Sequence, residues 1–181
     1  ALSKMMQKSA HQITSLIDEI IGLSLIESTE KMRREDTPVV NDLLRKCIRE
    51  YDDVVKKDVD LKLETTLADD LKIKTNENML KRIVSALLEN ACKYTEKGSI
   101  TLKAAEKDQW ICISVEDTGC GVPKKDAEKI FERFVKLDSF KEGIGLGLPL
   151  SRKLAEQLGG TVKLDTSYKG GARFNINIPI E

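Results

Sequence analysis

Two adjoining segments decide the fold: ENMLKRIVSALLENACKYT, residues 77–95, and SITLKAAEKDQWICISVED, residues 99–117. In the first, apolar residues recur at steps of three and four, which is the spacing of one face of an α-helix. In the second, two runs rich in β-branched residues flank a polar break, which predicts a strand hairpin. A helix followed by such a hairpin favours helices packed on a sheet.

The downstream segments extend this pattern. Residues 124–134, KKDAEKIFERF, predict a short helix, and residues 146–160, LGLPLSRKLAEQLGG, predict a longer one that is ended by glycines. Residues 161–167 and 172–180 predict two closing strands joined by a YKGG turn.

The upstream segments complete the element order. Residues 59–67, VDLKLETTL, alternate apolar and polar residues as a strand covered on one face does. Thr37-Pro38 precedes a further helical pattern, and we expect a domain boundary near residue 36. Because the strands and helices follow no regular strand–helix–strand repeat, the expected fold is an α/β two-layer sandwich. Its sheet is mixed but mostly antiparallel, and helices cover one face.

The first segment, residues 1–35, predicts a separate long helix with a narrow apolar seam that suits a helical partner. The pattern fits a helical bundle as well as a two-stranded coil, and a homodimer through this helix is one expectation. The seam consists of Leu2, Met6, Ser9, Ile13, Leu16, Ile20 and Leu23. Residues 36–181 then form the second predicted unit.

Composition excludes several classes of function. Thirty basic residues balance thirty acidic ones over 181 positions, so neither nucleic acid nor an anionic membrane is expected as a partner. No apolar run is long enough to span a bilayer. The four cysteines fit neither a metal motif nor a disulfide framework, which favours a reduced, cytoplasmic compartment; they are Cys47, Cys92, Cys112 and Cys120. The start at Ala1 is consistent with a piece of a longer protein.

Three polar features stand at the ends of these elements. Asn90 and Lys93 are three positions apart and share a helix face. The amide oxygen of Asn90 is a suitable ligand for Mg²⁺, and the ammonium group of Lys93 is suitable for binding phosphate. A solvated polar edge of the helix explains the two residues equally well. Asp117 and its glycines fit turn chemistry, and a carboxylate at a strand end could also accept from the exocyclic amine of adenine.

The third feature is EGIGLGLPLS, residues 142–151. It lacks both the strand context of a dinucleotide fingerprint and the GK[ST] ending of a P-loop. What remains is a glycine loop that opens a helix, with Pro149 tolerated in the first turn and free N–H groups able to receive phosphate oxygens.

Five segments in order resemble the N, G1, F, G2 and G3 boxes of the ATP-binding domains of sensor histidine kinases: LLENACKYT, DTGCGVP, IFERFVK, GIGLGL and KGGARF. IDEIIGLSLIESTEKM, residues 17–32, resembles the second helix of the dimerisation and phosphoacceptor hairpin of these kinases. The resemblance implies the Bergerat-type sandwich shared with gyrases and Hsp90-like ATPases, and ATP with Mg²⁺ as ligands.

The resemblance also implies a role for each matching residue. Asn90 would bind Mg²⁺, Lys93 a phosphate and Tyr94 the adenine or ribose. Asp117 would bind the adenine amine. The base pocket would be shaped by Gly119 and Gly121, and the phosphates framed by Gly143, Gly145, Leu146, Gly147 and Leu148.

A lid over residues 135–142 is the last implied part of the site. Phe131 and Phe134 would anchor it, although core packing is the commoner role for such aromatics. Arg133 would be available to the γ-phosphate.

Two positions depart from the family pattern. Ala86 stands where many members carry Asn and where the ATP-hydrolysing relatives carry a water-activating Glu, which disfavours direct hydrolysis. Ala172 replaces the usual Thr of the last box. Glu89 is the hypothetical group that assists proton transfer from a substrate imidazole.

The implied reaction is phosphoryl transfer from ATP to a histidine and onward to an aspartate of a response regulator. His11, the one histidine, is followed by QITS and lies sixteen residues before Glu27, too close for a hairpin. We therefore expect the acceptor on a first hairpin helix outside this sequence. The alternative from another class is a nucleotide-insensitive pseudokinase that acts as a dimerisation module.

Overall fold

The computed structural model describes residues 2–27, 34–138 and 145–181. Helices and strands alternate irregularly along the chain. The elements are α1 (Leu2–Glu27), α2 (Val40–Tyr51), β1 (Val59–Thr65), α3 (Glu77–Tyr94), β2 (Gly98–Lys107), β3 (Trp110–Asp117), the short 3₁₀ turns η1 (Lys124–Asp126) and η2 (Lys129–Phe131), α4 (Gly147–Gln157), β4 (Thr161–Leu164) and β5 (Arg173–Pro179).

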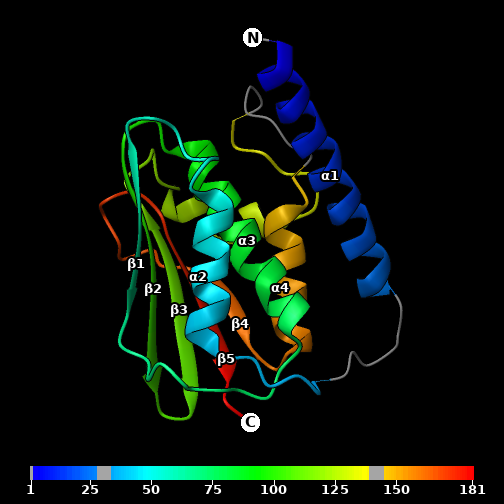
Figure 1. Cartoon of the computed structure of the whole chain (residues 1–181). Coiled ribbons are helices and arrows are strands. Elements are labelled where there is room, and N and C mark those ends of the chain that lie inside the picture. Colours follow the sequence, from blue (N-terminus) through cyan, green and yellow to red (C-terminus); the bar gives the residue numbers. More distant parts are fainter. Residues whose placement is uncertain (1, 28–33, 139–144) are drawn as a thin grey trace.

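The five strands form one sheet in the order β1-β2-β3-β5-β4, in which β1 pairs with β2 in parallel and the other neighbours are antiparallel. Helices α2, α3 and α4 lie side by side over one face of this sheet, and α1 lies outside them next to α4 (Figure 1). The expected two-layer sandwich with a mixed, mostly antiparallel sheet is confirmed.

Strand residues alternate between the two faces of the sheet. In β3, Ile111, Ile113 and Val115 are buried beneath the helices, whereas the residues between them are partly accessible. β2 and β5 repeat this pattern, so their apolar residues complete one core with the inner faces of α2 and α3. The alternation of apolar and polar residues in the sequence therefore identified correctly which face of the sheet the helices cover.

Helix α3 runs through the middle of the helical layer. Asn76 caps it, because its side chain accepts the Met79 N–H at 3.0 Å. Leu80, Ile83 and Leu87 are fully buried against the sheet. This packing fixes the opposite, polar edge of the helix where the candidate site lies.

Helix α1 packs against α4 through a glycine. A Cβ on Gly22 would lie 2.5 Å from Leu150 Cδ2, so a larger residue there would require the Leu150 side chain to move. The apolar seam residues of α1 whose side chains are described are exposed instead: Leu2, Met6, Ile13, Leu16 and Ile20. Leu23 and His11 lie in the helix, but their side chains are outside the described part.

The short helix expected over residues 124–134 is wrong in form. The chain makes two 3₁₀ turns there, η1 and η2. Phe131 packs edge-on against Phe174, with ring centroids 6.1 Å apart, and Arg152 of α4 covers its ring at 3.5 Å. These contacts with distant elements outweigh the weak helical preference of a short segment.

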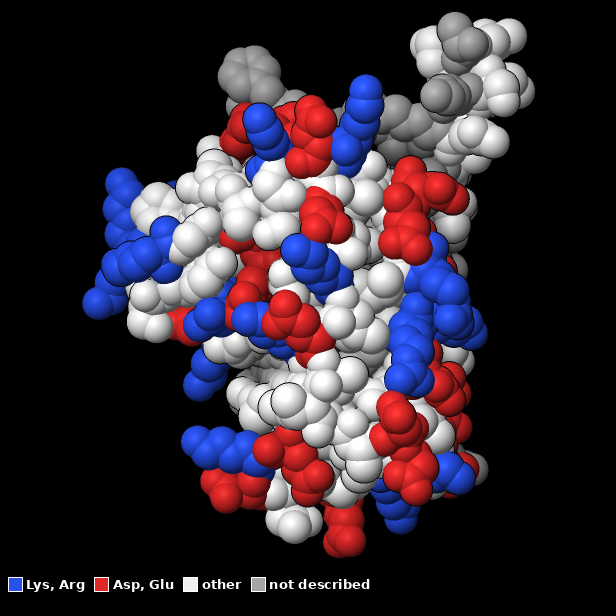
Figure 2. Space-filling view, turned by 60° about the vertical axis from the view of Figure 1, so that its left-hand side comes forward, with Lys and Arg blue, Asp and Glu red and all other residues white. Residues whose placement is uncertain are grey.

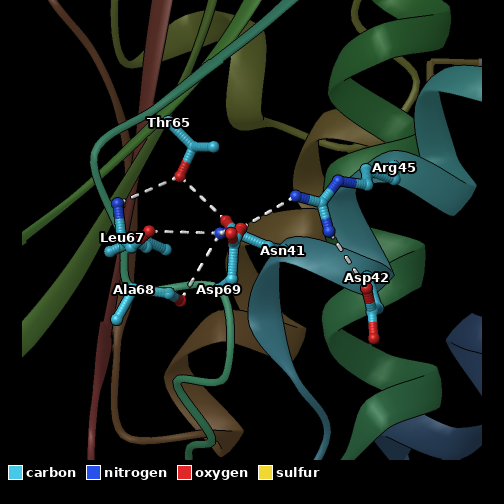
Figure 3. Close-up of polar contacts among 7 residues, drawn as sticks. All are labelled: Asn41, Asp42, Arg45, Thr65, Leu67, Ala68 and Asp69. Atoms are coloured by element: carbon cyan, nitrogen blue, oxygen red, sulfur yellow. Dashed lines mark hydrogen bonds and ion pairs between the residues drawn. The ribbon is translucent and has the colours of Figure 1, made fainter.

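A polar cluster with a buried centre and an exposed rim ties α2 to the loop after β1 (Figure 3). Asn41, fully buried, accepts from Thr65 Oγ1 at 2.8 Å and donates to the Leu67 carbonyl at 3.2 Å. Arg45 donates to Asp42 and Asp69 at 3.1 and 2.9 Å. We call these five side chains the Asn41 cluster. They satisfy one another, so the cluster fixes the helix on the sheet.

Charges of both signs are interspersed over the face of the molecule in Figure 2, and neither sign forms a continuous field there. This agrees with the balance of acidic and basic residues in the sequence.

Candidate functional site

A cavity of about 490 Å³ lies between the polar edge of α3, the end of β3 and the start of α4. Its size suits a small-molecule ligand. The residues proposed from the sequence that line it are Glu89, Asn90, Lys93, Tyr94, Asp117, Gly121, Gly145, Gly147 and Leu148. Segments up to 60 positions apart in the chain thus meet at one site.

Four of the proposed residues do not line the cavity: Gly119, Arg133, Phe134 and Leu146. Gly119 and Leu146 still support its wall, as described below. Arg133 is exposed, and Phe134 is 68% exposed. Gly143 lies outside the described residues, as do positions 139–142 of the expected lid.

Asp117 forms the wall at one end of the cavity, which we call the Asp117 end. It is 2% exposed, and its Oδ1 accepts the backbone N–H of Gly119 at 2.9 Å and of Ala172 at 3.2 Å. Burial raises the pKa of this carboxyl, and the two N–H groups act in the opposite direction. Both bonds use Oδ1, so Oδ2 is the oxygen that a ligand could use.

Three glycines allow the backbone to close around Asp117. A Cβ on Gly119 would lie 2.3 Å from the Tyr94 carbonyl oxygen, and one on Gly171 would lie 2.1 Å from the Asp117 carbonyl oxygen. Gly121 adopts φ +70°, in the left-handed region. Gly171 was not proposed from the sequence, although the doubled glycine at 170–171 was a visible signal.

The last turns of α3 supply the polar wall. Glu89, Asn90, Lys93 and Tyr94 are partly buried there. Asn90 forms no hydrogen bond through its side chain within the described part of the chain, so its amide is available to a ligand. An amide oxygen is a ligand type that Mg²⁺ accepts. Among the described residues no three His, Cys, Asp or Glu side chains group as a metal site, so a bound Mg²⁺ would need oxygens from another source.

The other end of the cavity, which we call the α4 end, is built mainly from backbone. Gly147, Leu148 and Pro149 form the first turn of α4 and line the cavity, and the N-cap residue Leu146 makes no side-chain cap. The first N–H groups of a helix have no partner within the helix and attract anions. Leu146, the N-cap residue, is buried and holds the turn in place.

The loop before α4 is closed at its base by backbone contact. The Phe134 N–H donates to the Gly145 carbonyl at 2.9 Å. Gly145 has φ +74°, and a Cβ there would lie 2.9 Å from Val135 O. Phe134 itself adopts φ +63°, which is uncommon for a bulky residue. The two aromatics thus separate: Phe131 is in the core, as the commoner role would have it, and Phe134 is exposed.

Four residues of the expected lid also line the cavity: Val135, Lys136, Leu137 and Asp138. The lining residues that sequence reasoning did not propose are Cys120, Val122, Pro123, Lys125, Asp126, Ile130, Pro149 and Phe174. Ala86 and Ala172, noted only as departures, line it as well. Most of these lie within or next to the five boxes, so proximity to a box was the available signal.

The fold and the cavity agree with one protein family. The family described as histidine kinase-, DNA gyrase B- and HSP90-like ATPase matches residues 75–181. The chain belongs to this family.

Among curated proteins, the relatives are sensor kinases. The chain is 27% identical to the sensor protein TorS of Escherichia coli over 95% of this chain and 19% of TorS. It is 35% identical to the adaptive-response sensory kinase SasA of Gloeothece citriformis over 66% of this chain and 32% of SasA. The chain therefore spans about a fifth to a third of the length of these relatives.

Among solved structures, the full-length protein ShkA in complex with AMPPNP resembles the chain with a TM-score of 0.82 and 26% identity. The match covers 97% of this chain and 37% of ShkA. It includes α1, which lies outside the residues that the family matches. Within the described ranges of this chain, no helix combines the length and apolar character needed to cross a membrane.

Proposed function

We propose that the chain is the catalytic ATP-binding portion of a sensor histidine kinase, which binds Mg·ATP and passes its γ-phosphoryl group to a histidine. The observation that carries this proposal is the position of the buried Asp117. Two backbone N–H groups hold its carboxylate at one end of the cavity, and the first turn of α4 lines the other end. The AMPPNP complex of ShkA and the names of the relatives support it.

At the Asp117 end, Oδ2 of the carboxylate would accept from the exocyclic amine of adenine. Guanine carries a carbonyl oxygen at that position, which the carboxylate would repel. The tight turns at Gly119 and Gly121 would shape the base pocket, and Tyr94 would contact the base or ribose.

The α3 edge and the α4 end would hold the phosphates. Asn90 would supply one oxygen ligand to Mg²⁺, and phosphate oxygens and water would supply the others. Mg²⁺, when bound, would neutralise charge on the phosphates. Lys93 and the backbone at Gly145, Gly147 and Leu148 would bind phosphate oxygens, with Gly143 in the same loop.

The reaction needs an acceptor histidine on a neighbouring helix. A ring nitrogen would attack the γ-phosphorus, the bond to the bridging oxygen would break, and ADP would leave. The proton on the other ring nitrogen would pass to Glu89, which lines the cavity beside Asn90. Arg133 stays a proposed γ-phosphate ligand that would have to approach from outside the present cavity wall.

The exposed apolar face of α1 would pair with the acceptor helix and with a second copy of the chain, as expected from its seam. A receiver domain of a response regulator would then take the phosphoryl group. We place the domain in the cytoplasm, where ATP is available and where its four free cysteines stay reduced. Residues 1–35 and 36–181 would be the two functional units.

The test is a calorimetric titration with ATP, with and without Mg²⁺, on the wild type and on Asn90→Ala. We expect micromolar binding that Mg²⁺ strengthens in the wild type, and loss of that Mg²⁺ effect in Asn90→Ala. Asn41→Ala serves as a matched control, since it removes an amide of the distant Asn41 cluster from α2. Absence of any nucleotide binding by the folded wild type would favour the nucleotide-insensitive dimerisation module.

A further inference from the structure

Five charged side chains alternate in sign across the entire sheet, on the face away from the helices. We call them the charge ladder: Glu64, Lys103, Glu116, Arg173 and Asp165. Lys103 Nζ lies 3.7 Å from Glu64 and 3.0 Å from Glu116. Arg173 lies 2.8 Å from Glu116 through Nε and 3.2 Å from Asp165 through a terminal nitrogen. Each strand, or the residue just after it, contributes one charge.

The ladder passes directly behind the Asp117 end of the cavity. Glu116 precedes Asp117 in β3, and Arg173 follows Ala172 at the start of β5; Glu116 and Arg173 are opposite each other in the register. On the inner face, Asp117 and Ala172 exchange the backbone bond of 2.9 Å and the side-chain bond of 3.2 Å. The ion pair is therefore directly next to the candidate ligand-binding carboxylate in the chain.

Arg173 is held more firmly than a typical surface arginine. Its guanidinium lies 4.3 Å from the centre of the Tyr168 ring while it donates to Glu116 and Asp165. Asp165 accepts from the backbone and hydroxyl of Ser167, and these bonds, with Arg173, lower the pKa of its carboxyl. The Glu116 side chain is only 13% exposed. Isolated surface pairs contribute little, but such a partly buried network can hold a strand pair in place.

The ends of β3 and β5, which the charge ladder joins, are closely packed against each other. The Asp117 carbonyl oxygen approaches Gly171 so closely that a Cβ would lie at 2.1 Å. Any shift of β5 relative to β3 would change this contact, and with it the bond from the Ala172 N–H to Asp117 Oδ1.

We propose that Arg173, with Glu116, is a positioning residue for nucleotide recognition: the pair fixes β5 on β3 and so aims the Asp117 carboxylate into the cavity. This inference rests on the proposed function, because the consequence of misplacing Asp117 is weaker and less selective binding of ATP. A lysine could meet one carboxylate but could not donate to both and cover Tyr168, so Arg173→Lys restores only part of the effect.

The experiment compares Arg173→Met with Arg173→Lys and with Arg45→Met. Arg45 is the matched control, because it also bridges two carboxylates and belongs to the Asn41 cluster shown in Figure 3. That cluster includes Thr65, which is in register with Ala104 of β2. Ala104 in turn is opposite Ile113 of β3, four positions before Asp117. Amide hydrogen exchange is measured at Gly119, Ala172 and Ile113, and Kd is measured for ATP and GTP.

We expect Arg173→Met to increase the rate of amide exchange at Gly119 and Ala172 about tenfold relative to Ile113. The Kd for ATP should rise about tenfold, and the preference of the protein for ATP over GTP should become smaller. Arg45→Met should leave both readouts at their wild-type values, even if it lowers stability. If Arg173→Met does not fold, Glu116→Gln, which keeps one acceptor, should show the same changes at smaller size.

The outcomes separate the two proposals. Wild-type protein that binds ATP, together with Arg173→Met that changes neither amide exchange nor Kd relative to Arg45→Met, overturns the positioning role alone. Wild-type protein that binds no ATP overturns the proposed function. The exchange rates at Gly119 and Ala172 then still decide whether Arg173 positions Asp117.

Discussion

The two ends of the cavity are built by different means. At the Asp117 end, a buried carboxylate is fixed by two backbone N–H groups, and glycines bring the surrounding backbone within contact distance. At the α4 end, the wall includes the start of a helix whose N-cap residue, Leu146, makes no side-chain cap, and the nearby Asn90 amide has no hydrogen-bond partner in the described chain. At the first end the protein fixes the carboxylate through Oδ1 and leaves Oδ2 for a ligand, and at the second end backbone N–H groups and an amide face the cavity.

This difference indicates that selectivity for the base and affinity for the phosphates would come from different ends of the cavity. A pre-positioned carboxylate discriminates between bases, because its hydrogen-bond pattern cannot adapt. Backbone N–H groups and the Asn90 amide would instead bind phosphate and Mg²⁺, which are common to all nucleotide complexes. The Asp117 end should therefore decide which nucleotide binds, and the α4 end how tightly its phosphates are held.

The largest effect is expected for Asp117→Asn. The asparagine oxygen can keep the two N–H bonds, but its NH₂ group would then face the adenine amine as a second donor. We expect the affinity for ATP to fall by about a thousandfold and the preference for ATP over GTP to disappear. Titration with both nucleotides measures this. An unchanged ATP preference would show that the Asp117 end does not read the base.

Gly171→Ala tests the close contact behind the same carboxylate. Its φ of +151° and the 2.1 Å approach of a Cβ to the Asp117 carbonyl oxygen force β3 and β5 apart. We expect the free energy of unfolding to fall by about 3 kcal/mol. Chemical denaturation provides the measurement, with Gly170→Ala as the control, since the nearest atoms to a Cβ there belong to the outer end of the Tyr168 side chain and not to backbone. Equal stability of the two variants would contradict the contact.

Gly145→Ala strains the loop at the α4 end. A side chain at φ +74° and 2.9 Å from Val135 O should cost about 1 to 2 kcal/mol of stability. Because the backbone at this end would bind phosphate, the variant should lose more affinity for ATP than for adenosine. If both ligands lose the same affinity, the loop does not distinguish phosphate from base.

The smallest effect is a pH dependence that comes from Asp117. Burial raises the pKa of its carboxyl in the folded state, so the fold binds this proton more readily than the unfolded chain does. As pH falls through the folded pKa, the wild type should therefore gain stability relative to Asp117→Asn, while its affinity for ATP decreases. Parallel denaturation curves from neutral to acidic pH measure the difference, which should be below about 1 kcal/mol. A wild type that loses stability relative to the variant on acidification would contradict the shift.

The main helices and strands were predictable because the spacing of their apolar residues indicates which face of each element is buried. The alternation in β1 and β3 and the helical spacing in α3 match the buried faces of the structure. Residues 124–134 were not predictable in this way, since Phe131 is positioned by Phe174 and Arg152, which are remote in the chain.

The location of the candidate site was predictable from its motifs. Residue type and position left Asn90 and Lys93 open to a solvated helix edge and Asp117 to turn chemistry, and the resemblance to the kinase boxes selected them; the structure brings all three to one cavity. Gly171 was missed because its role depends on the Asp117 carbonyl, 54 positions earlier in the chain. The charge ladder could not be seen either, because strand order decides which charges become neighbours.

The most direct test of the account is a crystal structure of the chain with Mg²⁺ and a non-hydrolysable ATP analogue. The account predicts that the exocyclic amine of adenine lies within hydrogen-bond distance of Asp117 Oδ2, with Mg²⁺ on the Asn90 amide oxygen and the phosphates against Gly145, Gly147 and Leu148. A base bound away from Asp117, or phosphates directed away from the start of α4, would contradict it.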